Sequence, residues 1–579
     1  MRVARRMFRS IVHGLAFALL GLAAATSAAA QANPAPDLVL TNGRIYTGAG
    51  ADPWAQAIGL KGDRIVFVGR ADQASALAGA ARVVDLRGGF VMPGMFDAHI
   101  HPGMVAVMGP GHPIVDSVAP KGDQDGPLPT RTKAAFFAAL REHARKRPDE
   151  QLVRLCCWNV EQFAPSGPDR RELDAIWPNT PVVIFDNSGH SYWANSTMLR
   201  LLGVTKATPD LTPVSFMTRD AHGEPTGWLK EFIATDKLAA LWLLPDDKLR
   251  LRMKAYLDFL ARNGDTAVFD GGNYGLEEHI YKAVADLDRA GQLPVRYFGS
   301  YHIWKPEQFD LAIPTLRRLQ AAYGTSHVTI NTAKIHYDGV ENLGSACEPI
   351  PTAADPGRRR VIAPRARLTR FIRDLDDAGM DLHIHALTAC ASDEALDAIE
   401  DARKQLGRPL RIHVAICHLA HVDAANIARF RELDVTANFT SQWFGGAWGA
   451  GEGFRQPMGS ILRTGANVSA GSDILYDSGI STTRPLIGVQ QSMTRAPSPG
   501  GPVNQAAERL TLAEALFSYT LGGARQQGVG DQIGTLEAGK RADLVVLGAD
   551  PFQADPFDVA KIPVRAVLMD GAVTAGSLD

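Results

Sequence analysis

Residues 91–101 read Val-Met-Pro-Gly-Met-Phe-Asp-Ala-His-Ile-His, a short apolar segment that ends in two histidines. The residues from Met95 onward predict a β-strand. Side chains two residues apart in a strand point to the same face, so His99 and His101 are expected to present both imidazoles to one side. The strand that opens the fold is therefore expected to carry chemically active groups at its end.

Seven further segments of this kind follow, and stretches of helical periodicity lie between them. The eight predicted strands are 95–101, 266–272, 295–302, 328–338, 381–386, 411–418, 434–442 and 466–473. Eight strands that are each followed by a helix predict an α/β fold, a (β/α)8 TIM-type barrel with buried parallel strands. The competing architecture, an open doubly wound sheet, requires a glycine fingerprint at the first strand–helix turn, and the sequence has none there.

The two ends of the chain and one long internal stretch do not fit the barrel pattern. Short alternating β-like segments at both ends predict a small composite β-sandwich domain formed by residues 31–92 and 535–579. The barrel then spans residues 93–534. Between its first two strands, residues from about 102 to 244 contain a helix and a strand of their own. They are predicted to form an insertion after the first barrel strand.

Residues 1–30 have the features of a signal peptide: several arginines, a short apolar run over 11–25, and alanines at 28–30. The apolar run is shorter than the ~20 residues that a membrane-spanning helix needs, which favours export over anchoring. The segment that begins with Arg5 and Arg6 also resembles a twin-arginine signal. We therefore expect an exported, periplasmic protein with no stable membrane span after the signal peptide is removed.

The composition excludes several classes of protein. With 46% hydrophobic and 21% charged residues among 579, the chain is expected to be globular and not disordered. Lys and Arg number 60 and Asp and Glu 62, so no basic field is available to bind nucleic acid. Five cysteines are too few for a disulfide framework.

Polar residues gather at the predicted strand ends, where the active sites of such barrels lie. They are His99, His101, Lys334, His385, His418 and Asp473. One histidine on an apolar strand is usually a core residue, but several buried imidazoles at one site are costly unless they share a partner. Imidazole and carboxylate are ligands of zinc and similar divalent ions. The sequence therefore predicts a divalent-metal site, most simply for zinc, at the mouth of the barrel.

These motifs resemble those of a known family. Residues 91–101 resemble the opening strand motif of the amidohydrolase superfamily, and residues 534–547 (Gly-Thr-Leu-Glu-Ala-Gly-Lys-Arg-Ala-Asp-Leu-Val-Val-Leu) resemble its return into the small β-domain. Four further segments resemble the amidohydrolase family 3 branch, which includes N-substituted formamide deformylases: 171–183, 189–196, 223–227 and 333–339. The resemblance covers essentially everything after the signal peptide.

The resemblance implies a metal-dependent amidohydrolase. It assigns the six strand-end residues to the metal site, with one or two ions per chain, and in relatives the lysine at the position of Lys334 can be carboxylated to bridge two ions. A Schiff-base role for Lys334 is the alternative, but an aldolase has no use for the surrounding histidines. A bound metal lowers the pKa of water to about 7, and the resulting hydroxide is expected to attack an amide-type carbonyl. Asp473 is the predicted general base and acid.

The predicted substrate is a small molecule with an amide, N-acyl or N-formyl group. His190 is a candidate for binding the developing oxyanion, and Trp443 for lining the mouth, which would favour apolar or aromatic compounds. An ester or lactone hydrolase on the same site, or an inactive barrel that acts as a binding protein, are the alternatives. Intact ligands at all the strand ends argue against the inactive barrel.

The chain departs from the family pattern at two strand ends. Relatives tend to carry Gly-Asp after the position of His385, where this chain has Ala386 and Leu387, and many carry Glu at the position of Cys417. We interpret Cys417 and His383 as packing or supporting groups. Cys417 as a metal ligand is disfavoured, because strand alternation should turn it away from the face of His418.

Overall fold

The computed structural model describes residues 35–108, 116–117, 132–353, 355–445, 456–475 and 482–578. The predicted signal peptide lies outside these residues. Within them, no helix is both long enough and apolar enough to cross a bilayer.

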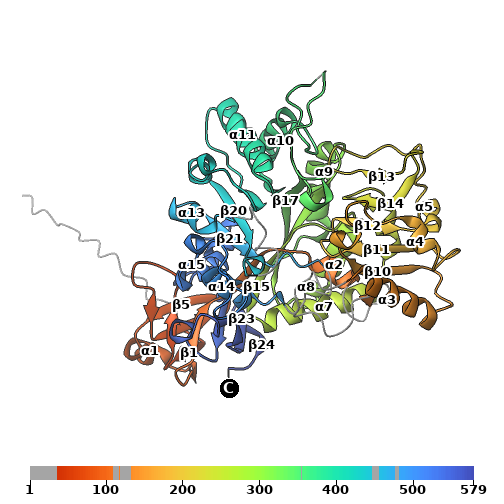
Figure 1. Ribbon diagram of the computed structural model, residues 1–579. Coiled ribbons are helices and arrows are strands. Elements are labelled where there is room, and N and C mark those ends of the chain that lie inside the picture. The colour runs from red at the N-terminus through yellow and green to blue at the C-terminus, as the bar shows by residue number, and fades with distance from the viewer. Residues whose placement is uncertain are drawn as a thin grey trace, which may run out of the picture. The chain divides into compact units, whose positions relative to one another are not determined.

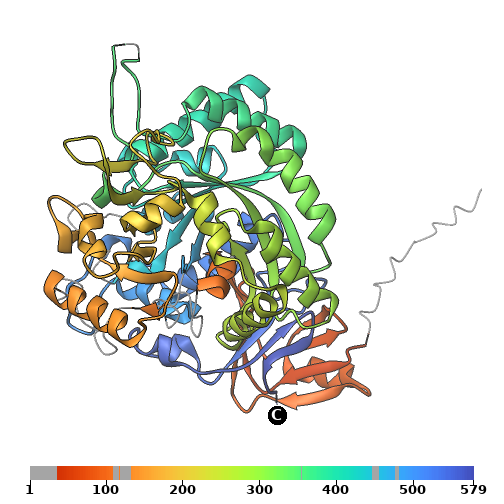
Figure 2. The same ribbon diagram turned by 90° about the vertical axis from the view of Figure 1, so that its right-hand side faces the viewer.

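Eight strands in sequence order form one sheet, which Figures 1 and 2 show at the centre of the fold. They are β8 (Met95–Ile100), β15 (Asp265–Asp270), β16 (Arg296–Ile303), β17 (Val328–His336), β18 (Asp381–Ala386), β19 (Val414–His418), β20 (Val435–Thr440) and β21 (Val468–Gly471). Each strand pairs in parallel with the next. Helices on the outside include α7 (Asp246–Arg262), α8 (Glu277–Arg289), α9 (Gln308–Tyr323), α10 (Arg365–Ala378) and α11 (Ala389–Leu406). The predicted (β/α)8 barrel is confirmed.

Backbone hydrogen bonds connect the first and last strands at the carboxyl end of the barrel. The N–H of Asp473, just after β21, donates to the carbonyl oxygen of His99 at 2.7 Å. The N–H of His101 donates to the carbonyl oxygen of Ile474 at 3.1 Å. These bonds fix Asp473 beside His99 of β8 and beside His101, which directly follows that strand.

Two further sheets lie outside the barrel, and the first of them combines strands from both ends of the chain. One has the order β24-β23-β22-β7-β2-β3, with β2 (Arg44–Tyr46), β3 (Trp54–Ala55), β7 (Phe90–Pro93), β22 (Leu544–Leu547), β23 (Val564–Met569) and β24 (Ala572–Gly576). The other has the order β5-β4-β1-β6, with β1 (Leu38–Thr41), β4 (Ala57–Lys61), β5 (Arg64–Gly69) and β6 (Arg82–Asp85). An apolar cluster that includes Leu40, Ile45 and Leu544 joins residues of both. Figure 2 shows the N-terminal and C-terminal strands side by side.

A buried ion cluster connects the barrel to these terminal strands. Arg296, the first residue of β16, pairs with Asp543 (Nε–Oδ2 2.8 Å) and contacts Asp570. His327 lies 2.7 Å from Asp288 and 2.9 Å from Asp570. The hydrogen bond to Asp570, opposed by burial and reinforced by Asp288, raises the pKa of His327. Burial alone would raise the pKa of Asp570, but His327 and Arg296 hold it below its usual value.

The insertion between β8 and β15 has a sheet of its own, in the order β13-β14-β12-β11-β10-β9. Its strands are β9 (Asp116–Ser117), β10 (Val153–Trp158), β11 (Val182–Asp186), β12 (Ser191–Ala194), β13 (Met217–Arg219) and β14 (Pro225–Lys230), and α3 (Lys133–Lys146) packs beside them. Trp158, Trp193 and Trp228 pack edge to face in its core. These tryptophans stabilise the insertion because they bury large apolar rings there.

Candidate metal-binding active site

The six residues predicted to bind metal line one cavity at the carboxyl ends of the barrel strands, and His190 lines it too. β8, β17, β18 and β19 supply four of the six, His101 directly follows β8, and Asp473 follows β21. Residues distant in sequence therefore meet as the barrel topology predicts.

Three of these residues have the spacing of ligands around one ion. Asp473 Oδ1 lies 3.4 Å from His99 Nε2 and 3.3 Å from His101 Nε2. A tetrahedral zinc ion with bonds of about 2.0–2.1 Å separates its ligand atoms by roughly 3.3–3.4 Å. His99, His101 and Asp473 therefore fit a divalent ion.

Other residues contact the Nδ1 atoms of His99 and His101, the ring nitrogens that do not face Asp473. His99 Nδ1 lies 3.0 Å from His383 Nε2, and His101 Nδ1 lies 2.9 Å from the Gly272 carbonyl oxygen. Such contacts orient a ligand ring and leave its other nitrogen for the metal. The structure thus places His383 behind His99, where a supporting role was predicted.

Asp338, which the sequence analysis did not identify, holds His385 in the same way. Its Oδ1 lies 3.0 Å from His385 Nδ1 and accepts a hydrogen bond from the Leu387 N–H at 3.0 Å. Its Oδ2 accepts a hydrogen bond from the Thr388 hydroxyl at 3.1 Å. Asp338 lies in the 333–339 motif, and its position two residues after the end of β17 was the signal that could have identified it.

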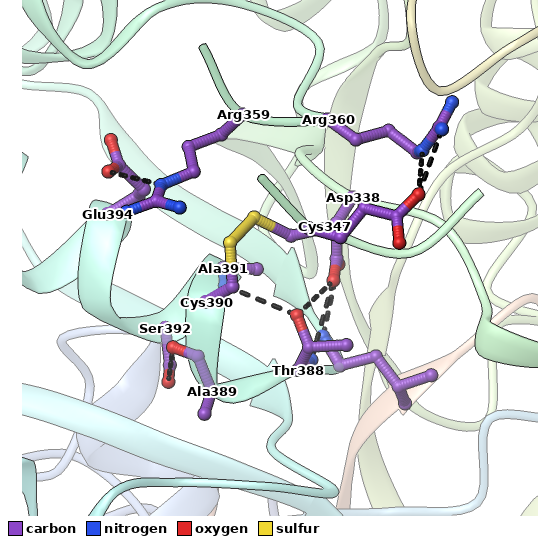
Figure 3. The surroundings of a disulfide bond; sticks show 12 residues. Asp338, Cys347, Arg359, Arg360, Thr388, Ala389, Cys390, Ala391, Ser392 and Glu394 are labelled. Atoms are coloured by element: carbon purple, nitrogen blue, oxygen red, sulfur yellow. Dashed lines mark hydrogen bonds and ion pairs between the residues drawn. A yellow bond between two sulfur atoms is a disulfide. The ribbon is translucent and has the colours of Figure 1, made fainter. Parts of the chain in front are cut away.

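A disulfide joins the two segments that carry this support, as Figure 3 shows. Cys347, in the segment that follows β17, is bonded to Cys390, the second residue of α11. Thr388 caps that helix by accepting a hydrogen bond from the N–H of Ala391. The cysteine count did not predict this bond, because the pairing depends on how β17 and β18 align.

Lys334 lies deeper in the barrel and is 2% exposed. Its Nζ lies 3.5 Å from His99 Nε2 and 3.2 Å from Cys417 Sγ. Within the described part of the chain, no carboxylate lies within 4.0 Å of it. A buried lysine that lacks a carboxylate partner is unusual, because burial of an unpaired ammonium is costly.

The prediction that Cys417 points away from the site is wrong. His418 has a φ of 74°, in the left-handed region, so strand alternation ends at that residue. Cys417 therefore faces inward, and its sulfur belongs to a group of potential ligands with His99 and His418. Burial raises the pKa of the Cys417 thiol to about 12, so the thiol is protonated and accepts a hydrogen bond from Lys334.

Burial lowers the pKa of several imidazoles at the site. The pKa values of His99, His385 and His418 all lie below the usual value for histidine, mainly because of desolvation. In His385, the hydrogen bond to Asp338 partly offsets this effect. The rings are therefore neutral near pH 7, which is the form that binds metal.

The two predicted substrate-binding residues occupy different positions. His190, between β11 and β12, has its ring centroid 5.6 Å from that of His385, and its Nδ1 lies 2.8 Å from Glu231 Oε2. Burial lowers the pKa of His190, but Glu231 more than offsets this and raises it to about 8. Trp443 stacks on His418 with centroids 5.5 Å apart. Glu231, directly after β14, is a second residue that the sequence analysis missed.

Comparison with known proteins connects this geometry to a family. Residues 82–575 match the sequence model of the amidohydrolase family. The N-substituted formamide deformylase of Arthrobacter pascens is 27% identical over 564 residues, 93% of this chain and 98% of that protein. The putative amidohydrolase YtcJ of Bacillus subtilis is 25% identical over 85% of this chain and 90% of its own length.

Solved structures share the fold. An uncharacterized metal-dependent hydrolase from Pyrococcus horikoshii superimposes with a TM-score of 0.63 at 22% identity, over 90% of this chain and 99% of that one. Atrazine chlorohydrolase TrzN from Arthrobacter aurescens, complexed with zinc, gives a TM-score of 0.51 at 16% identity, over 93% and 96%. At these identities the likeness establishes the architecture of the chain and no more.

Proposed function

Because the chain belongs to the amidohydrolase family and is therefore a metal-dependent hydrolase, we propose that it hydrolyses a carbon–nitrogen bond in a small N-formyl or N-acyl compound. The observation that carries this proposal is the spacing of Asp473 from His99 and His101, which matches one ion. The similarity to a formamide deformylase over nearly the full length of both chains supports the substrate class.

His99, His101 and Asp473 would hold the first ion, and Lys334, His385 and His418 complete the set for up to two. We propose zinc, because the donors are mostly imidazoles. The lack of a carboxylate partner for Lys334 among the described residues supports its carboxylation, which replaces the positive charge with a ligand. A bound ion supplies an activated water and polarises the substrate carbonyl.

Asp473 is the residue that we assign to proton transfer. Its Oδ1 faces His99 and His101, and its Oδ2 lies 3.6 Å from His418 Nδ1. The backbone bond to His99 keeps the carboxylate at that position. It accepts the proton of the attacking water and delivers it to the departing nitrogen, which makes the amine a better leaving group.

A hydrolysis screen tests the proposal. Zinc-loaded protein is incubated with N-formyl amines, N-acyl amines and the matching esters, and the release of amine and acid is followed by NMR. We expect turnover of the amides that a chelator abolishes and zinc restores. Turnover of the esters alone would contradict cleavage of the carbon–nitrogen bond, and no turnover of any compound would favour the binding-protein alternative.

Trp443 is expected to contact the part of the substrate that leaves. Because its ring lies against His418, Trp443→Ala should raise KM for N-benzyl amides about tenfold with little change in kcat. The N-methyl amide, which lacks the aromatic ring, is the control and should be unaffected. If Trp443→Ala and the parent had the same KM for the N-benzyl amide, Trp443 would not be part of the substrate site.

We also propose export through the residues 1–30 signal, with Arg5 and Arg6 as the twin-arginine pair. The Cys347–Cys390 disulfide supports an oxidising compartment, where such bonds persist. Fractionation of the parent and of an Arg5→Lys/Arg6→Lys variant tests this. Retention of the variant in the cytoplasm is expected, and unchanged export would contradict the twin-arginine route.

A further inference from the structure

His302, near the end of β16, is a histidine at the active-site cavity to which neither the metal set nor the proposed reaction gives a role. Its side chain borders the same cavity as the metal-site residues and is 1% exposed. Its backbone is held on both sides: the N–H donates to Glu277 Oε1 at 3.4 Å, and the carbonyl oxygen accepts from Gln308 Nε2 at 3.3 Å. The ring is therefore fixed in place by groups that do not touch its nitrogens.

The ring nitrogens of His302 lack hydrogen-bond partners. Neither Nδ1 nor Nε2 has one among the described residues. By contrast, His190 and His385 each contact a buried carboxylate through Nδ1. A buried polar group that stays unpaired is costly, and at the edge of a cavity it points to a partner supplied by a bound molecule.

Aromatic side chains surround this ring, and they leave its lone pair unmatched. The ring centroids of Phe232, Tyr274 and Trp304 lie 5.4, 5.2 and 5.2 Å from that of His302, all in edge-to-face contact. Burial lowers the pKa of His302, so the neutral ring has one N–H donor and one lone pair. The face of an aromatic ring is negative, so it attracts an N–H but not a lone pair. The group that most needs a partner is therefore the acceptor nitrogen of His302.

Gly272 places the His302 ring beside a predicted metal ligand. A Cβ atom at Gly272 would lie 2.8 Å from His302 Cγ and 2.9 Å from its Nδ1, and the φ of Gly272 is 130°, so only glycine fits there without strain. The Nδ1 side of the ring thus packs against the Gly272 backbone. The carbonyl oxygen of the same glycine lies 2.9 Å from His101 Nδ1. One glycine therefore separates His302 from His101, and Nε2 is the nitrogen that remains for a bound molecule.

The amide N–H of the substrate is the donor that suits this acceptor. We propose that His302 is a specificity-determining residue whose Nε2 accepts a hydrogen bond from the N–H of the scissile amide. The protein would then select secondary amides, which carry one N–H, over tertiary amides, which carry none. This inference rests on the proposed function, because it names the kind of amide within that substrate class. A site with a buried acceptor rejects an analogue that lacks the donor, since the acceptor then stays unpaired.

The binding of two matched formamides tests this selection without turnover. Zinc-loaded Asp473→Asn protein is titrated in a calorimeter with N-benzylformamide, which has an N–H, and with N-benzyl-N-methylformamide, which has none. We expect Kd to be about 10–100-fold lower for the first compound, the usual effect of leaving a buried acceptor unpaired. Adding His302→Phe, which keeps a ring but no acceptor, should abolish the difference. Equal Kd values in Asp473→Asn, or binding of neither compound, would overturn the proposal.

Further variants separate hydrogen bonding from size and from metal binding. A preference that persists in His302→Phe would come from the extra methyl group and would overturn the proposal. His302→Gln restores an acceptor oxygen and should recover part of the preference, and His279→Gln, an exposed histidine on α8, is the matched control that should keep all of it. Zinc content should be the same in every variant, and loss of an ion in His302→Phe would make His302 a ligand instead. Absence of hydrolysis in the parent would contradict only the proposed reaction, because the Kd ratio does not depend on turnover.

Discussion

Asp473 is held on two sides, by its backbone bond to His99 and by the imidazoles that face its carboxylate. Asp473→Asn keeps this shape and one oxygen for the metal but cannot accept a proton. We expect kcat to fall by 10²–10⁴-fold, which is the usual contribution of a general base. Metal content measured on the same sample should stay within twofold of the parent, and near-normal kcat would exclude Asp473 as the base.

Asp338 acts on the metal site through His385. Asp338→Asn weakens the contact at His385 Nδ1, so metal affinity should fall by 10–100-fold, as for other carboxylates behind ligand histidines. Competition with a chelator measures this change. Asp355→Asn, on the exposed segment that follows β17, is the control, and equal affinities in the two variants would mean that the Asp338 carboxylate has no positioning role.

At the scale of residues, the sequence predicted the groups at the strand ends and missed those that support them. His99, His385 and Asp473 were identifiable because a barrel brings strand ends together wherever they lie in the chain. Glu231 and Asp338 approach from loops whose paths depend on tertiary packing. The orientation of the Cys417 side chain was predicted wrongly, because alternation requires a regular strand backbone. The backbone of the next residue, His418, is in the left-handed region.

The disulfide between Cys347 and Cys390 belongs to the scale of elements, because it fixes the segment after β17 to the start of α11. It closes a loop across a sequence separation of 43 residues, and removing such a bond costs about 2–4 kcal/mol. A Cys347→Ser/Cys390→Ser variant should unfold at a lower denaturant concentration, and its free energy of unfolding should be lower by that amount. The parent treated with dithiothreitol should match it, whereas a parent insensitive to the reductant would show that the bond is not stabilising.

The elements themselves were well predicted, because strand and helix periodicities alternate along the chain. Strand 381–386 and helix 133–146 coincide with β18 and α3. Other predicted strands extend a few residues too far, as 466–473 does beyond β21. The last two residues of that prediction, Ser472 and Asp473, are polar and lie in the loop that follows β21.

For the whole molecule, the ion cluster around His327 makes stability depend on pH. The folded pKa of His327 is raised, so its contribution is fully present below its unfolded pKa of about 6.5 and is lost as pH rises through the higher folded value. The folded pKa of Asp570 is lowered, so its contribution is present above about pH 4 and is lost at lower pH.

His327→Gln should therefore destabilise the protein most at pH 5–6.5 and progressively less toward pH 9. Urea unfolding of the parent and the variant across this range measures the difference. His279→Gln, outside the cluster, should give the same curve as the parent. A difference between the parent and His327→Gln that does not change with pH would mean that His327 stabilises by packing alone.

The pairing of β22 with both β7 and β23 has a consequence for how the protein is made. Strand β7 ends at Pro93, and its partner begins at Leu544, after the whole barrel. At roughly 5–20 residues per second, a ribosome needs on the order of 20–90 s to travel between them. Throughout that interval β7 lacks its partner and offers an unpaired edge to other chains. Each newly made chain is therefore exposed to aggregation through β7 during this interval, which ends only when residues 544–547 become available to pair with it.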